Sequence, residues 1–132
     1  MRVFFDTNVL VSAFTAHGTA ERAFQLALLS HTVLTSEYVL GELRAKLSQK
    51  MKVPAAEMSF TLEYIRKVAE IVPAKGVAPK RSRDPKDDQV LHDAMSGGAG
   101  ILVSGDKDLL SVTDLEGIAV ISPRSWIELH TQ

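Results

Sequence analysis

The 132-residue sequence predicts an α/β domain with a small parallel sheet that is covered by helices on both faces. Short apolar runs of strand length alternate with longer amphipathic stretches, a pattern typical of parallel strands connected through helices. The formal net charge is −1, cysteine is absent, and 45% of the residues are hydrophobic, as is typical of one globular domain. We therefore expect a single domain over residues 1–132.

The N-terminal part is expected to contain a strand followed by two helices. The run Val3–Phe5 is β-branched and aromatic, which favours a buried strand. A helix over Asn8–Phe14 follows it. Thr19 is a candidate N-cap for a second helix over Ala20–Leu29, which has apolar residues along one side.

The middle of the chain continues with a strand, two helices and another strand. Residues 31–36 (HTVLTS) predict the second strand, and Ser36 then N-caps a helix that runs to about Lys50. Pro54 suits the first turn of the next helix. Residues 69–74 (AEIVPA) predict the third strand.

A polar segment separates this half from the next helix. Residues 75–88 (KGVAPKRSRDPKDD) contain Pro and Gly among charged residues, which predicts an exposed loop. Asp84 and Pro85 predict the N-cap and first residue of a helix that ends at Gly97-Gly98.

The C-terminal part is expected to complete the sheet. Residues 100–106 (GILVSGD) predict the fourth strand, and a short helix follows it through Leu110. Residues 118–122 (IAVIS) predict the fifth strand. A terminal helix from Pro123 contains Trp126, which we expect to lie in the core.

Four carboxylates lie just after predicted strands or near the start of predicted helices. Asp6 ends the first strand, and Asp106 follows the fourth. Glu42 lies two turns into the helix after the second strand, and Asp88 lies one turn into the helix before the fourth. Because open parallel sheets bind ligands outside the carboxyl ends of their strands, all four side chains can point toward one edge.

Each acidic residue also has a structural interpretation. Asp6 can cap the helix that follows it, and Glu42 can be an ordinary surface residue. Asp84 and Asp87 are assigned mainly to helix capping, and Asp108 is placed to cap the short helix after Asp106 or to lie outside the ligands. The placement of the four carboxylates together favours a site over any one of these interpretations.

Several carboxylates at one point repel each other and raise one another's pKa values unless a cation compensates them. Oxygen ligands without His or Cys favour Mg²⁺ or Mn²⁺, and we expect one or two ions. Such an ion activates water and neutralises charge on an attacked phosphate. The pattern therefore favours phosphodiester hydrolysis.

At these residues the sequence resembles the PIN-domain family of metal-dependent nucleases, which includes the toxins of VapBC-type toxin–antitoxin pairs. The resemblance covers nearly the whole chain and rests on FFDTNVLVSA, TSEYVLGEL, RDPKDDQVLHDAMSGGAGILVSGDKDLL and ISPRSWIEL. The third block is similar to a subgroup that is usually described as toxin components. The family's acidic positions fall on Asp6, Glu42, Asp88 and Asp106, and its polar accessory positions fall on Asn8, Ser36 and Ser104.

The resemblance implies a three-layer α/β/α sandwich around a five-stranded parallel sheet. It also implies a Mg²⁺- or Mn²⁺-dependent endoribonuclease that cleaves single-stranded RNA, forms homodimers and is inhibited by a small antitoxin. Since Asp84, Asp87 and Asp88 are clustered, Asp87 can share the third acidic position with Asp88.

Basic residues near the acidic ones are candidates for RNA contacts. Lys80, Arg81 and Arg83 precede the aspartate cluster, and Lys107 lies between two candidate site residues. Arginine binds phosphate groups bidentately. The alternative interpretation of the basic run is a solvated loop.

A PIN-fold protein that binds RNA or a partner without catalysis is the main alternative function, although the presence of all four carboxylates argues against it. An aspartyl-phosphate phosphotransferase is disfavoured because Asn8 stands where its motif requires a second aspartate. Too few apolar residues precede Asp6 for a signal peptide, and no stretch has the length of a membrane helix. We therefore expect a cytoplasmic protein.

Overall fold

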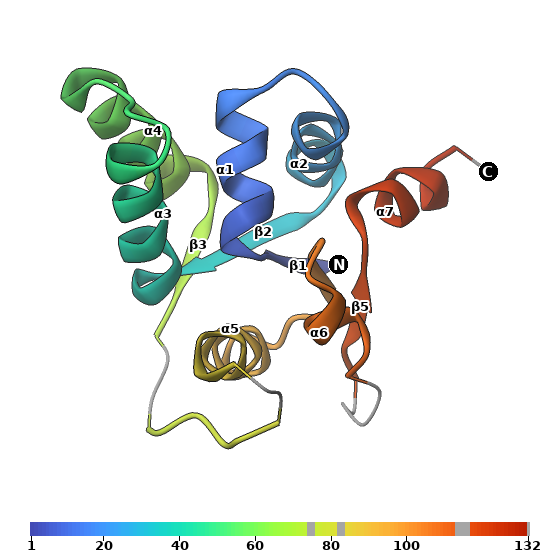
Figure 1. Ribbon diagram of the computed structural model, residues 1–132. Coiled ribbons are helices and arrows are strands. Elements are labelled where there is room, and N and C mark those ends of the chain that lie inside the picture. Colours follow the sequence, from blue (N-terminus) through green and yellow to red (C-terminus); the bar gives the residue numbers. More distant parts are fainter. Residues whose placement is uncertain (74–75, 82–83, 113–116, 132) are drawn as a thin grey trace.

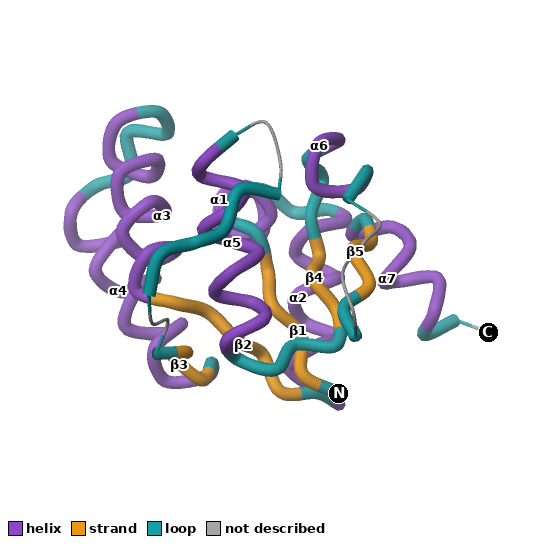
Figure 2. The backbone as a smooth tube through the Cα atoms, turned by 90° about the horizontal axis from the view of Figure 1, so that it is seen from below, coloured by secondary structure: helices purple, strands orange, loops and turns teal. Residues whose placement is uncertain are grey.

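In a computed structural model, described for residues 1–73, 76–81, 84–112 and 117–131, the chain forms a five-stranded sheet flanked by helices (Figures 1 and 2). The strands are β1 (Arg2–Phe5), β2 (Thr32–Ser36), β3 (Glu70–Val72), β4 (Ile101–Val103) and β5 (Ala119–Ile121). Their order is β3-β2-β1-β4-β5, and every neighbouring pair is parallel. The predicted α/β class with its five-stranded parallel sheet is confirmed.

Seven helices belong to the described part of the chain: α1 (Thr7–Thr15), α2 (Thr19–Ser30), α3 (Glu37–Gln49), α4 (Ala55–Val68), α5 (Pro85–Ser96), α6 (Lys107–Leu110) and α7 (Pro123–Leu129). Figure 1 shows α1, α2, α7 and the α3–α4 pair on one side of the sheet and α5 on the other. In Figure 2, which is turned to view the molecule from below, α5 lies across the strands. The predicted three layers are therefore present.

The core lies on both faces of β1, the central strand. Val3, Phe4 and Phe5 are each 0% exposed, as expected for a parallel strand that is covered by helices on both sides. Trp126 of α7 is 1% exposed, and its Nε1–H donates to the carbonyl oxygen of Ala23 at 2.9 Å. The prediction that Trp126 belongs to the core is confirmed.

The two helix caps predicted in the first half of the chain have different outcomes. The Oγ atom of Ser36 accepts a hydrogen bond from the backbone N–H of Val39, so Ser36 caps α3 as expected. Thr19, in contrast, is the first residue of α2 rather than its cap. The N-cap of α2 is Gly18, which has no side chain to offer, so this helix begins without a side-chain cap bond.

The C-terminal end of α5 is closely packed against the sheet. A Cβ atom added at Gly97 would lie 2.5 Å from Cγ2 of Val72 in β3. The carbonyl oxygen of Gly97 also accepts a hydrogen bond from Nε of Arg2 in β1 at 2.8 Å. These contacts fix the position of α5, whose opposite end carries the aspartate cluster.

The parallel topology brings the functional segments to one edge. Phe5 pairs with Val103 across β1 and β4, so that Asp6 and Ser104 follow neighbouring strand ends. Within the described ranges, no helix combines the length and the hydropathy that a membrane span requires.

Candidate metal centre

A small acidic cleft of about 70 Å³ opens beyond the carboxyl ends of β1 and β4. Four parts of the chain form its walls: the β1–α1 junction, α3, the first turn of α5, and the segment between β4 and α6. The lining residues are Asp6, Thr7, Asn8, Glu42, Lys46, Asp84, Lys86, Asp87, Val90 and Asp106. The structure therefore brings three of the four predicted acids, Asp6, Glu42 and Asp106, to one cleft.

Asp6 is held on both of its carboxylate oxygens. Oδ1 accepts the backbone N–H of Thr7 at 2.8 Å, and Oδ2 accepts the hydroxyl of Ser104 at 2.9 Å. Asp6 is thus both the N-cap of α1 and a wall of the cleft. Burial raises the pKa of Asp6, whereas these two hydrogen bonds lower it; the nearby charge of Asp106 adds to the increase.

Asp106 lies at the start of α6 and caps it. Its Oδ1 accepts the backbone N–H of Asp108 at 2.8 Å, and its own N–H donates to the Oγ of Ser104 at 3.0 Å. The prediction that Asp108 caps this helix is therefore wrong, because the cap is Asp106 itself. Ser104, a predicted accessory residue, joins Asp6 to Asp106 through its hydroxyl.

At the start of α5, Asp87 lines the cleft, whereas Asp88 does not. Oδ1 of Asp88 accepts the backbone N–H of Arg81 at 2.9 Å, so Asp88 holds the preceding loop. Successive residues of a helix point about 100° apart, so the two adjacent aspartates face different directions. The structure places Asp87 in the position that the sequence analysis gave to Asp88.

Asp87 has a buried carboxylate oxygen that no hydrogen bond satisfies in the described part of the chain. It is 7% exposed, and its Oδ2 has no hydrogen-bond partner within the described residues. Burial raises the pKa of Asp87 to about 7, with further increases from the charges of Asp106, Asp84, Asp6 and Asp108.

The donor set fits a hard divalent cation. Carboxylate oxygens of Asp87, Asp106 and Asp108 lie within 4.8 Å of one another, and Asp6 and Glu42 line the same cleft as the first two. These are oxygen ligands of the kind that Mg²⁺ and Mn²⁺ prefer. A cation would also supply the partner that the buried Oδ2 of Asp87 lacks.

Two lysines that the sequence analysis did not identify also line the cleft. Nζ of Lys46 donates to Oδ1 of Asn8 at 2.7 Å, and its charge lowers the pKa of Asp6. Lys86 enters from the first turn of α5. Lys46 follows Glu42 by one helical turn, and this spacing is the signal that could have identified it.

Ser36, a predicted accessory residue, forms its side-chain hydrogen bonds outside the cleft lining. It is not part of the cleft lining; its Oγ donates to Oδ2 of Asp93 at 2.5 Å. Asp93 is 0% exposed, and its Oδ1 accepts the amide of Gln89 at 2.8 Å. Ser36 and Asp93 therefore connect the end of β2 to α5, and the sequence analysis missed Asp93.

Two of the three predicted RNA-contact residues, Arg81 and Lys107, lie outside the cleft lining. Arg81 and Lys107 are exposed, and neither belongs to the lining. Arg83 falls outside the described residues.

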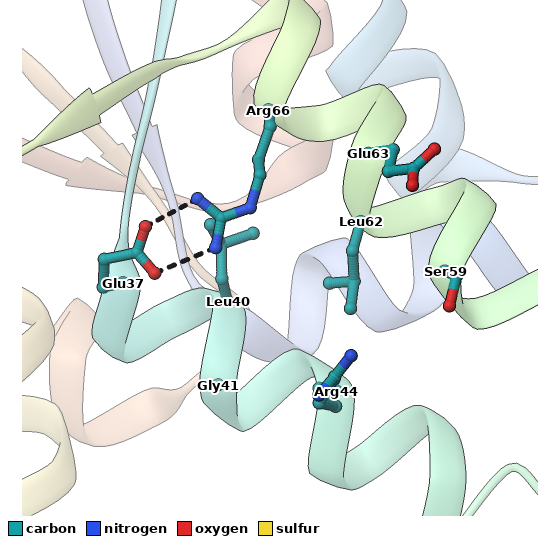
Figure 3. Close-up of a pocket in the computed structure, with 8 residues that line it drawn as sticks. All are labelled: Glu37, Leu40, Gly41, Arg44, Ser59, Leu62, Glu63 and Arg66. Carbon is teal, nitrogen blue, oxygen red and sulfur yellow. Dashed lines mark hydrogen bonds and ion pairs between the residues drawn. The ribbon is translucent and has the colours of Figure 1, made fainter. Parts of the chain in front are cut away.

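A second concave region of about 360 Å³ lies between α3 and α4 (Figure 3). Glu37 and Arg66 form a two-bond ion pair across it, at 2.6 and 2.9 Å, and Gly41 and Arg44 lie along its α3 wall. None of the acids of the cleft lines this groove. Helix α3 thus presents Glu42 and Lys46 to the cleft and a separate set of residues to α4.

Three solved structures have similar folds. A chain of the VapBC2 complex from Rickettsia felis, crystallised with a DNA fragment from its promoter, is 16% identical, with 92% of this chain and 98% of that chain covered and a TM-score of 0.68. PAE2754 from Pyrobaculum aerophilum is 17% identical, with coverage of 100% and 97% and a TM-score of 0.68. The sarcin–ricin-loop-cleaving toxin VapC20 from Mycobacterium tuberculosis is 16% identical, with coverage of 86% and 98% and a TM-score of 0.62.

At these identities the structural similarity concerns the fold. Among curated proteins no sequence gives a significant match. Residues 2–108, in contrast, match the family model of the PIN domain, a range that contains every strand except β5 and all the acids of the cleft. The chain therefore belongs to the PIN-domain family.

Proposed function

We propose that this PIN domain is a metal-dependent endoribonuclease that hydrolyses phosphodiester bonds in single-stranded RNA. The observation that carries the proposal is the buried Oδ2 of Asp87, which lacks a hydrogen-bond partner in the described part of the chain while Asp6, Asp106 and Asp108 surround the same carboxylate. Burying an unpaired carboxylate is costly, and a cation removes that cost.

We assign Asp6, Glu42, Asp87 and Asp106 as the residues that would hold one or two Mg²⁺ or Mn²⁺ ions. Asp87 replaces Asp88 in this assignment because Asp87 lines the cleft and Asp88 accepts a backbone hydrogen bond from the loop. When bound, such an ion activates water and neutralises charge on the leaving oxygen.

The residues around these ligands orient them. Both oxygens of Asp6 accept hydrogen bonds, and the hydroxyl of Ser104 joins Asp6 to the backbone of Asp106. Hydrogen bonds of this kind hold a ligand in one orientation and so favour binding of the ion.

Two lysines supply positive charge beside the acids. The amide oxygen of Asn8 holds the ammonium group of Lys46, and Lys86 lines the same cleft. RNA carries a negative phosphate on either side of the bond that is cut, and lysines bind such groups as point charges. We infer that Lys46 and Lys86 bind these neighbouring phosphates.

We further propose that the protein is the toxin of a type II toxin–antitoxin pair, acts as a homodimer and is inhibited by a small antitoxin. The similarity of its fold to a chain of the VapBC2 complex and to the toxin VapC20 supports this role. An adjacent gene for a small protein with a DNA-binding N-terminus would support it further, and co-purification of that protein as a complex would test it.

The proposal is tested by incubating the purified protein with end-labelled single-stranded RNA and Mn²⁺ or Mg²⁺. We expect cleavage with the metal, none with EDTA, and at least about 100-fold slower cleavage by Asp6→Asn. Asp93→Asn is the matched control, since it makes the same change at a buried carboxylate outside the cleft. RNA binding by the folded protein without cleavage under either metal would contradict the nuclease proposal and favour the non-catalytic alternative.

A further inference from the structure

We propose that a further cavity, which lies beside Asp106 and is separate from the groove between α3 and α4, binds the nucleobase of the nucleotide next to the scissile phosphate. This inference deepens the proposed function and rests on it. The cavity measures about 270 Å³ and lies between α1, the start of α2, the β4–α6 segment and the start of α7. Its lining includes Asn8, Val9, Ser12, Ala20, Asp106 and Pro123.

The cavity adjoins the acidic cleft. Asn8 and Asp106 line both, so the two spaces meet at these side chains. A nucleotide whose phosphate lies at the acids can therefore place its base in the cavity beside Asp106.

The chemistry of the lining suits a base better than a phosphate. Among the described lining residues there is no lysine, arginine or histidine that could bind a phosphate, and Asp106 is the one charged residue. Val9, Ala20 and Pro123 supply apolar contact area, and the amide of Asn8 and the hydroxyl of Ser12 can hydrogen bond to polar atoms. A heteroaromatic base needs this combination, since it has apolar faces and hydrogen-bonding edges.

Small residues leave the space open. Ala20 lies on the wall that α2 contributes, and Gly105 lies on the wall between β4 and α6. A Cβ atom added at Gly105 would meet no atom within 4 Å, so the structure has room at this point. Larger side chains at the edge of the cavity should fill it without displacing the acids.

The first test is independent of catalysis. We would record ¹H–¹⁵N spectra of the protein with millimolar 5′-monophosphates of the four ribonucleosides, and with ribose 5-phosphate, in the presence of Mg²⁺. At least one nucleotide should shift the amide signals of Ser12 and Ala20, whereas ribose 5-phosphate should leave them in place. Equal shifts with ribose 5-phosphate, or no shift with any nucleotide, would overturn the inference.

Filling variants localise the binding. Ala20→Met should remove the nucleotide-induced shifts, and Ser12→Met should do the same from an exposed position of α1. Ala45→Met is the matched control, because Ala45 is exposed on α3 and does not line the cavity. Retained shifts in both filling variants would contradict the inference.

Cleavage separates this inference from the proposed function. After the cut sites in an RNA oligonucleotide are mapped, removal of the base on one side of the bond should slow cleavage by the wild type about tenfold. The filling variants should cut the intact and abasic RNA at equal rates. If the wild type cuts RNA at the same rate when the base on either side of the bond is missing, the cavity inference fails and the nuclease proposal stands. If nucleotides bind in the cavity but no RNA is cut, the cavity inference stands and the nuclease proposal fails.

Discussion

Two buried carboxylates on the same helix, α5, have opposite surroundings. Asp93 is 0% exposed, and its two oxygens accept hydrogen bonds from Ser36 and Gln89 at 2.5 and 2.8 Å. Asp87 is 7% exposed, and in the described structure its Oδ2 has no partner. Burial raises the pKa of Asp87, and the neighbouring acids raise it further.

The difference lies in hydrogen bonding rather than in burial. Buried polar groups in folded proteins almost always have partners, so the bonds of Asp93 explain it as a structural link between α5 and β2. The exposed fraction alone would not separate it from Asp87. The missing partner of Asp87, together with the nearby acids, supports the proposed cation site.

The largest expected effect is on cleavage. Asp87→Asn should slow RNA cleavage at least about 100-fold, because it removes a charged ligand from the cleft. Asp93→Asn should stay within about threefold of the wild type, since an asparagine oxygen can still accept the hydrogen bond from Ser36. Initial rates with saturating Mn²⁺ measure both, and equal losses in the two variants would break the comparison.

The second effect is on the free energy of unfolding, which a change at Asp93 should lower and a change at Asp87 should not. Asp93→Ala should lower the free energy of unfolding by about 2–4 kcal/mol, because the hydroxyl of Ser36 and the amide of Gln89 lose their acceptor and a small cavity forms. Asp87→Asn should raise it by about 1 kcal/mol in EDTA, because repulsion within the cleft decreases. Urea unfolding measures both, and an unchanged stability of Asp93→Ala would contradict its structural role.

The third effect is on the pH dependence of stability without metal. The pKa of Asp87 is about 7 in the folded protein against 3.8 for an ordinary aspartate, so the folded state binds more protons between these values. This group therefore stabilises the protein less as the pH rises from about 4 to 7, and the raised pKa of Asp6 acts in the same direction.

The measurement is urea unfolding in EDTA at pH 5 and pH 8. The decrease between the two values should be about 1–2 kcal/mol smaller in Asp87→Asn than in the wild type. Asp93→Asn is the control, because it also replaces a carboxylate of α5 by an uncharged amide. Parallel pH profiles of Asp87→Asn and the wild type would contradict the assigned surroundings of Asp87.

The smallest effect concerns Asp88. Asp88→Asn should slow cleavage less than about fivefold, because its carboxylate holds the loop at Arg81 instead of lining the cleft. The same cleavage assay checks this. If Asp88→Asn abolished cleavage and Asp87→Asn did not, the family position assigned from sequence would be the correct one and the structural assignment would fail.

Much of the fold could be predicted because its signals are local. The buried strand at Val3–Phe5 and the cap at Ser36 depend on residues within a few positions of one another. The choice between Asp87 and Asp88 depends on the rotational phase with which α5 packs on the sheet, which the adjacent aspartates do not encode. The role of Asp93 could not be predicted because its partner, Ser36, is 57 residues away.

The cap of α6 also could not be predicted from sequence, although its two candidates lie only two residues apart. Asp106 and Asp108 both stand where a cap can form, and the choice depends on where α6 begins. Lys46 could have been identified from its spacing to Glu42 on α3, whereas the place of Lys86 in the cleft depends on how α5 packs beside Asp6.

The central claim is that Asp6, Glu42, Asp87 and Asp106 together bind a divalent cation. A titration with substoichiometric Mn²⁺, followed by ¹H–¹⁵N spectra, tests it most directly because the ion broadens signals near its site. We predict that the amide signals of Asp6, Asp87 and Asp106 broaden first, that Trp126 in α7 stays sharp, and that Asp87→Asn requires at least about tenfold more Mn²⁺. Sharp signals at Asp6 and Asp106 while other parts of the chain broaden, or an unchanged titration of Asp87→Asn, would contradict it.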